Sequence, residues 1–273
     1  MFEENILTEI LAAAPAFLLI AVRAFAMIQV APLLSSDAIP QVAKFSLAGF
    51  AAYASFSSAL VRDWVIAPFG LNFVFLVIGE ALIGIIIGFF MVIIFAAFSS
   101  AGQFFSLQMG FGASETFDPL AQVENPLLGQ YLNMVAMLIF VTIDGFRDLF
   151  LGGFWRSLQS INVMSLVSGR EHIVTMVMAG LSRLFFDAFI IALPILGTLF
   201  LVSLTTGLIS KASPQINILS EGFPISIMVA FLVIFTALPF MTEMFARIIG
   251  SGFETLQTLY IRIGERIAEG GNL

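Results

Sequence analysis

The stretch AFIIALPILGTLFLVSLTTGLIS (residues 188–210) contains no Asp, Glu, Lys or Arg, and neither does GFPISIMVAFLVIFTALPFMT (residues 222–242). The two stretches are 23 and 21 residues long, and a helix of about 20 apolar residues crosses the roughly 30 Å hydrocarbon core of a bilayer. Within lipid the backbone must satisfy its own hydrogen bonds, which a single helix does and a single strand does not. Both stretches therefore predict membrane-type helices.

Outward from this pair, four further apolar segments bring the expected number to six: Ile10–Leu34, Phe45–Val61, Ala81–Gly110 and Asn125–Ile143. The apolar region Trp64–Phe105 is too long for one ordinary span. It is either one long, kinked helix or a hairpin that turns near Gly84–Gly88. Pro194 and Pro239 lie inside apolar segments and are expected to kink them.

The composition agrees with a membrane class: 60% of the residues are hydrophobic, 11% are charged and the mean hydropathy is +1.05. A soluble domain carries about a quarter charged residues, so an ordinary soluble domain is excluded. The net charge of −7 comes from acids spread over the connecting segments, and we expect membrane lipid but no nucleic acid as a partner. The predicted fold is an all-α, membrane-associated bundle of long, kinked helices and helical hairpins.

The distribution of basic residues gives an orientation. With six alternating spans, one side would carry seven Lys or Arg and the other two. The seven are Arg62, Arg147, Arg156, Arg170, Arg247, Arg262 and Arg266, and the two are Lys44 and Lys211. This pattern predicts that both termini are cytoplasmic.

Four charged residues lie inside apolar segments: Arg23, Glu80, Arg183 and Asp187. A lone Arg at the centre of a span costs about 3 kcal/mol, whereas each Leu, Ile, Phe or Val contributes about −0.5 kcal/mol. Ile10–Leu34, with Arg23, Gln29 and Pro15, is thus expected to insert only marginally by itself. Arg183 and Asp187 are spaced i, i+4 and could pair on one helix face, and Glu80 could pair with Arg23 or with another subunit's Arg. The alternative is a proton or ion relay.

Catalytic motifs are not found in the sequence. There is no Cys, and His172 is the single histidine, so no two-histidine metal site can form. Gly110-Phe111-Gly112 lacks the third glycine of a dinucleotide fingerprint. We expect no enzyme, no metal and no cofactor, and an intramembrane enzyme is the weakest of the alternatives.

Three blocks resemble the FliR family of flagellar biosynthetic proteins, which has relatives in virulence secretion systems. They are APLLSSDAIPQVAK (31–44), LQMGFGASETFDP (107–119) and GLISKASPQINILSEGFP (207–224). The resemblance covers essentially the whole chain in order, with Arg23 ahead of the first block. The third block is the most specific, because Ser-Pro-Gln-x-Asn followed by Gly-Phe-Pro between apolar helices is a rare combination.

The resemblance implies a noncatalytic subunit of the flagellar type III protein export gate in the bacterial inner membrane, within the flagellar basal body. It implies packing with FliP-like and FliQ-like subunits in a helical multi-subunit gate, an FlhB-like switch protein as a further partner, and exported unfolded flagellar proteins as transient partners. Residues 1–170 would form a FliP-like part. Residues 171–273 would form a FliQ-like helical hairpin that ends in an amphipathic surface or subunit-contact helix, Phe253–Ala268.

The same resemblance gives the glycine-bearing loop at about 106–119 a role as a pore plug. Its candidate residues are Met109, Gly110, Phe111, Gly112 and Phe117. Methionine can repack around a passing chain, an apolar constriction can exclude water, and glycines give a moving loop its freedom. The family pattern differs in that Glu115 separates the two aromatic residues here. The alternative is that these apolar side chains pack against neighbouring subunits.

A polytopic secondary transporter for a small solute or ion is the alternative function. It would use interrupted helices and buried charges to bind its substrate near the membrane midplane. It also predicts a repeat-related pair of interrupted segments, and the sequence shows no convincing internal repeat.

Overall fold

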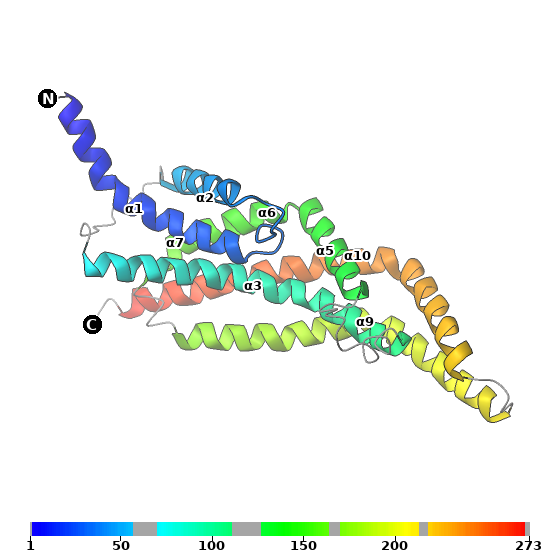
Figure 1. Cartoon of the computed structure of the whole chain (residues 1–273). Coiled ribbons are helices and arrows are strands. Elements are labelled where there is room, and N and C mark those ends of the chain that lie inside the picture. Colours follow the sequence, from blue (N-terminus) through cyan, green and yellow to red (C-terminus); the bar gives the residue numbers. More distant parts are fainter. Residues whose placement is uncertain (1, 57–69, 111–126, 164–169, 213–217, 271–273) are drawn as a thin grey trace. The chain divides into compact units, whose positions relative to one another are not determined.

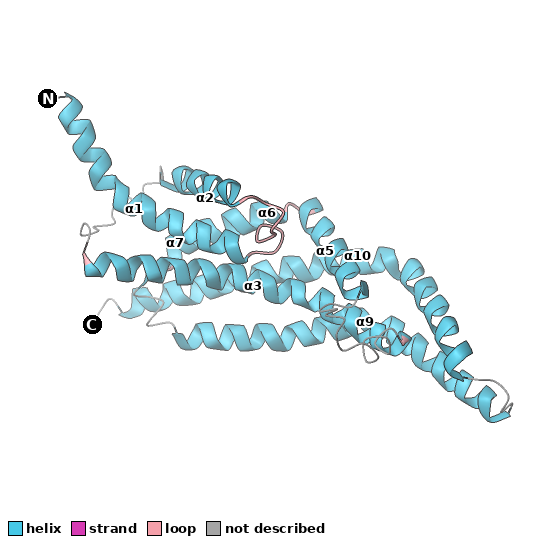
Figure 2. Cartoon of the chain, viewed as in Figure 1, coloured by secondary structure: helices cyan, strands magenta, loops and turns pink. Residues whose placement is uncertain are grey.

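The computed structural model describes residues 2–56, 70–110, 127–163, 170–212 and 218–270, and the regular elements among them are all helical (Figures 1 and 2). The predicted all-α, membrane-type class is confirmed. The helices are α1 (Phe2–Val30), α2 (Gln41–Phe56), α3 (Leu71–Met109), α5 (Leu127–Thr142), α6 (Gly145–Arg147), the π-helix η2 (Asp148–Trp155), α7 (Arg156–Ser160), α9 (Arg170–Ala212) and α10 (Ile218–Gly270).

Helix α3 settles the alternative left open by the sequence. It runs without a break for 39 residues, so the chain makes no hairpin near Gly84–Gly88. Helix α3 contains no proline, and its glycines serve a close contact with another helix, described below. Pro15, Pro194, Pro224 and Pro239 likewise lie within continuous helices.

Four of the described helices are long and apolar enough to cross a membrane, over Ala13–Val30, Leu71–Met109, Ile173–Ala212 and Gly222–Arg262. They correspond to four of the six expected segments. The other two, Phe45–Val61 and Asn125–Ile143, lie partly outside the described residues, and their described helices α2 and α5 are 16 residues each. The number of six spans and the orientation deduced from it stay predictions.

The chain divides into two compact units, and α3, α9 and α10 each contribute to both. Unit 1 comprises Met1–Val92, Asp144–Ala179 and Ser251–Leu273, and unit 2 comprises Ile93–Ile143 and Gly180–Gly250. The predicted FliP-like part (1–170) and FliQ-like part (171–273) were defined by likeness to other subunits and not by compactness. That division stays a prediction.

In unit 1, α1 and α2 form an antiparallel pair joined by the first sequence block. Phe25 stacks on Phe45 with ring centroids 4.2 Å apart, and Phe17 meets Phe56 edge to face. In the turn between the helices, Leu33 has a φ of 68°. The buried Lys44 donates a hydrogen bond of 3.0 Å from Nζ to the carbonyl oxygen of Ser35 and closes the turn.

The C-terminal part of α10 also belongs to the core of unit 1. Leu256, Leu259 and Tyr260 are buried, while Glu254 and Arg262 are exposed. The expected amphipathic pattern is present. The helix expected over Phe253–Ala268 is the last part of α10, and its role as a surface or subunit-contact helix stays a prediction.

Unit 2 is built around an aromatic cluster and a glycine crossing. Phe98 lies 4.4 Å from Phe245 and 6.0 Å from Phe95 between ring centroids, and Phe95 is 5.6 Å from Phe140. A Cβ added to Gly102 would lie 2.5 Å from the Cα of Gly129. Helices α3 and α5 therefore touch backbone to backbone at this point, which a larger residue would prevent.

Candidate functional site

The candidate site in unit 1 begins with a close crossing of α1 and α3. A Cβ added to Gly84 would lie 2.9 Å from the Cβ of Ala26 and 3.0 Å from the amide nitrogen of Met27. One turn later, a Cβ on Gly88 would lie 2.8 Å from the Cβ of Val30 and 2.9 Å from the carbonyl oxygen of Met27. The contacts advance together along both helices, so α1 and α3 run parallel.

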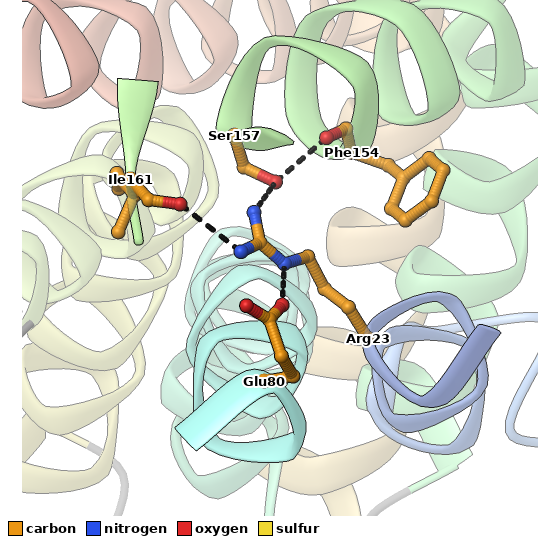
Figure 3. A network of polar contacts seen from close by, with 5 residues as sticks. All are labelled: Arg23, Glu80, Phe154, Ser157 and Ile161. Carbon is orange, nitrogen blue, oxygen red and sulfur yellow. Dashed lines mark hydrogen bonds and ion pairs between the residues drawn. The ribbon is translucent and has the colours of Figure 1, made fainter. Parts of the chain in front are cut away.

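This crossing brings two charged side chains together. Glu80 precedes Gly84 by one turn of α3, and its Oε2 accepts a hydrogen bond of 2.5 Å from Nε of Arg23 on α1 (Figure 3). The side chains are 0% exposed for Arg23 and 3% exposed for Glu80. A buried charge is tolerated only when it is paired and its remaining hydrogen-bonding groups are satisfied.

The remaining nitrogens of Arg23 reach a third segment. Nη1 donates to Oγ of Ser157 at 3.1 Å, and Nη2 donates to the carbonyl oxygen of Ile161 at 3.0 Å. The Ser157 hydroxyl in turn donates to the carbonyl oxygen of Phe154 at 2.6 Å (Figure 3). We call Arg23, Glu80, Ser157, Ile161 and Phe154 the Arg23 cluster.

Helix α10 is tied to the same region through the π-helix η2. The hydroxyl of Tyr260, a buried residue, donates a hydrogen bond of 2.9 Å to the carbonyl oxygen of Gly153. Nη1 of Arg156 donates to Oε1 of Gln257 at 2.6 Å. The polar contacts of unit 1 thus join α1, α3, α7, η2 and α10, which are far apart in the sequence.

This arrangement can hold helices together. Among the described residues, Arg23 is the one ionisable group that hydrogen-bonds Glu80. The described residues include no group of three or more His, Cys, Asp or Glu side chains that could hold a metal ion.

The second predicted charge pair lies in unit 2. Nε of Arg183 and Oδ2 of Asp187 are 3.5 Å apart, one turn from each other on α9. Their side chains are 48% and 14% exposed. The pair is therefore open on the Arg183 side, unlike the enclosed Arg23 cluster.

The root of the predicted plug loop also lies in unit 2. Met109 is fully buried at the end of α3, and the amide of Gly110 donates a hydrogen bond of 3.1 Å to the carbonyl oxygen of Leu107. Gly110 has a φ of 90°, and a Cβ there would overlap the ring of Phe223. The second and third sequence blocks thus meet at Gly110 and Phe223. Phe111, Gly112 and Phe117 lie outside the described residues.

Sequence reasoning missed several residues that the structure brings into these sites. Ser157 sits in an ordinary Arg-Ser-Leu-Gln-Ser segment, and Ile161 takes part through its carbonyl oxygen, which no side-chain pattern reveals. A buried hydrogen bond from Tyr260 could have been predicted from the sequence. This residue lies on the apolar face of an amphipathic helix, and a buried tyrosine hydroxyl usually finds a hydrogen-bond acceptor.

Comparison with known proteins gives a consistent result over most of the chain. Residues 14–252 match the model of a family described as bacterial export proteins, family 1. The chain is similar to the flagellar biosynthetic protein FliR of Bacillus subtilis, with 28% identity over 92% of this chain and 96% of that protein. It is 31% identical to FliR of Borreliella burgdorferi over 72% of this chain and 73% of that protein.

The similarity extends to a protein with a different name. The surface presentation of antigens protein SpaR of Shigella sonnei is 27% identical over 59% of this chain and 61% of its own length. The matched region in the family comparison contains both the Arg23 cluster up to Ile161 and the Gly110 contact with Phe223.

Proposed function

Because this chain belongs to the family of bacterial export proteins, family 1, we propose that it is a noncatalytic wall and plug subunit of the flagellar type III protein export gate. It is a membrane protein and a component of type III export. In the proposal it packs with FliP-like and FliQ-like subunits in the bacterial inner membrane, at the flagellar basal body. An FlhB-like switch protein and unfolded flagellar proteins are the remaining partners.

The observation that carries the proposal is the family match over residues 14–252, which includes parts of both compact units. Four membrane-capable helices among the described residues agree with a channel wall. Many large apolar side chains remain exposed on these helices, for example Phe185 and Phe200 on α9 and Phe235 on α10. Such faces need lipid or partner subunits to cover them.

The plug role is supported by how the loop begins. Gly110 adopts a backbone conformation that other residues rarely take, and Phe223 covers it. The buried Met109 fixes the end of α3 directly before this point. In our proposal the loop starts from a fixed root, and Met109, Gly110, Phe111, Gly112 and Phe117 close the pore between export events.

Two experiments test the export role and the plug role separately. Removal of the gene from the bacterium of origin, with the parent chain supplied in trans as the control, should abolish secretion of flagellar subunits into the medium. Deletion of residues 110–116 should leave the subunit assembled and raise ion leakage across the membrane. Normal secretion without the chain would refute the export role, whereas normal assembly with unchanged leakage would refute the plug alone.

A further inference from the structure

We infer that Glu80 of α3 is the residue that holds α1 in the membrane, so that α3 acts as an anchor within the chain and Arg23 of α1 is the group it captures. The first helix would then depend on the third for its insertion. This dependence concerns how the subunit is built and is separate from its role in export.

Helix α1 carries the charge of Arg23 where a charge is least favourable in a membrane. Arg23 lies near the middle of the membrane-capable stretch Ala13–Val30, where an unpaired Arg is most unfavourable. The same helix includes Pro15 and Gln29. These residues leave a segment that inserts marginally when nothing compensates the guanidinium.

Every described hydrogen-bond partner of Arg23 comes later in the chain. Glu80 follows by 57 residues, Ser157 by 134 and Ile161 by 138. A chain is synthesised from its N-terminus, so α1 leaves the ribosome before any of these groups exists. Glu80 is the first of them to appear and the one that carries a compensating charge.

Helix α3 is suited to be the anchor. It is 39 residues long, the mean hydropathy of its most apolar 18 residues is 2.9, and Glu80 is the single charged residue of the helix. A helix of that length and composition inserts without help. Glu80 then places one carboxylate in the apolar layer, where it attracts a cation.

The helix surfaces next to the Arg23–Glu80 ion pair allow α1 and α3 to pack closely. Gly84 and Gly88 follow Glu80 at one-turn intervals and let the backbone of α1 approach that of α3 directly. Such small residues are the common means by which helices associate in lipid. The glycines thus supply the close packing, and Glu80 selects the register in which Arg23 is neutralised.

The absence of cysteine from the chain permits a test of α1 without background labelling. Ala38 is exposed in the connection after α1, so Ala38→Cys reports on which side of the membrane that connection lies. Full-length chain is expressed in bacteria, and spheroplasts are labelled with a membrane-impermeant maleimide after a short pulse of synthesis. Total label after detergent treatment normalises for any chain that is degraded.

If both termini are cytoplasmic, as the distribution of basic residues predicts, the reporter in the parent with Ala38→Cys should be labelled from outside. Adding Glu80→Ala should lower the ratio of accessible to inaccessible reporter about tenfold, which corresponds to about 1.4 kcal/mol. Adding Arg23→Leu to the Glu80→Ala chain should restore the parent ratio, because no charge then needs a partner. Glu243→Ala is the matched control, since Glu243 forms an exposed pair with Arg247 on α10 and should leave the ratio unchanged.

Unchanged labelling in the Glu80→Ala chain would overturn the inference. So would a double variant that stays as low as Glu80→Ala, because the loss would then come from damaged packing and not from an unpaired Arg23. Neither outcome depends on secretion, so the test is independent of the proposed export role.

Discussion

The hydroxyl of Tyr260 donates a hydrogen bond of 2.9 Å to the carbonyl oxygen of Gly153, which lies 107 residues earlier in the chain. Gly153 belongs to the π-helix η2, whose wider turn departs from the usual backbone pairing. The Ser157 hydroxyl donates to the neighbouring carbonyl of Phe154. Two side chains thus fix one end of the π-helix, and each is held by a different part of unit 1.

Tyr260→Phe removes one of these bonds and leaves the Gly153 carbonyl without this donor. We expect a loss of about 1 kcal/mol in unfolding free energy, together with faster amide hydrogen exchange within η2. Hydrogen exchange followed by mass spectrometry on the detergent-solubilised protein measures this. Tyr53→Phe is the control, because Tyr53 is 73% exposed. Equal exchange in the two variants would show that Tyr260 does not hold η2.

Glu80→Ala leaves Arg23 buried without a counter-charge. Removal of one partner of a buried ion pair costs about 3–5 kcal/mol, and we expect this loss in a thermal unfolding experiment in detergent. The double variant Arg23→Met with Glu80→Leu should recover most of the stability, since two apolar side chains need no pairing. A double variant less stable than Glu80→Ala would mean that the cluster contributes more than charge compensation.

Gly88→Ala tests the close approach of α1 and α3. Its Cβ would lie 2.8 Å from the Cβ of Val30 and 2.9 Å from a backbone carbonyl, so one helix must shift. We expect a destabilisation of about 1–3 kcal/mol.

Gly197→Ala is the matched control for that substitution, because a Cβ at position 197 of α9 meets no atom within 4 Å. There alanine should be neutral or should stabilise by up to about 1 kcal/mol through its helix propensity. Similar unfolding temperatures for the two variants would argue against the backbone contact between α1 and α3.

Gly110→Ala tests the root of the loop. The φ of 90° disfavours any residue with a Cβ, and we expect a loss of at least about 1 kcal/mol. Adding Phe223→Ala removes the overlap with the aromatic ring but not the backbone strain, so rescue should be partial. Gly250→Ala is a control in open space on α10. Full rescue by Phe223→Ala would show that the ring, and not the backbone, requires glycine.

The sequence predicted the helical class and the existence of buried charges, because hydropathy and charge are local properties. It also proposed Arg23 as a partner for Glu80, since few charges are available in the apolar segments. It left α3 undecided between one helix and a hairpin. The structure places Gly84 and Gly88 against α1, and a contact between residues about 60 positions apart has no local signature.

Other features depend on three-dimensional packing and could not be predicted, because they too leave no local pattern in the sequence. Ile161 contributes a backbone carbonyl, and Ser157 was one serine among many. Four of the six expected segments correspond to described helices that are long enough to cross a membrane. A window of hydropathy measures how apolar a segment is but not where its helix begins and ends.

The composition of the complex that this chain forms tests whether it is a subunit of an export gate. The chain is co-expressed with the FliP-like and FliQ-like proteins of the same genome, extracted in mild detergent and analysed by native mass spectrometry. We expect one discrete assembly that contains all three proteins. A stable monomer or homodimer of this chain, with both partners expressed but absent from it, would refute its role as a gate subunit.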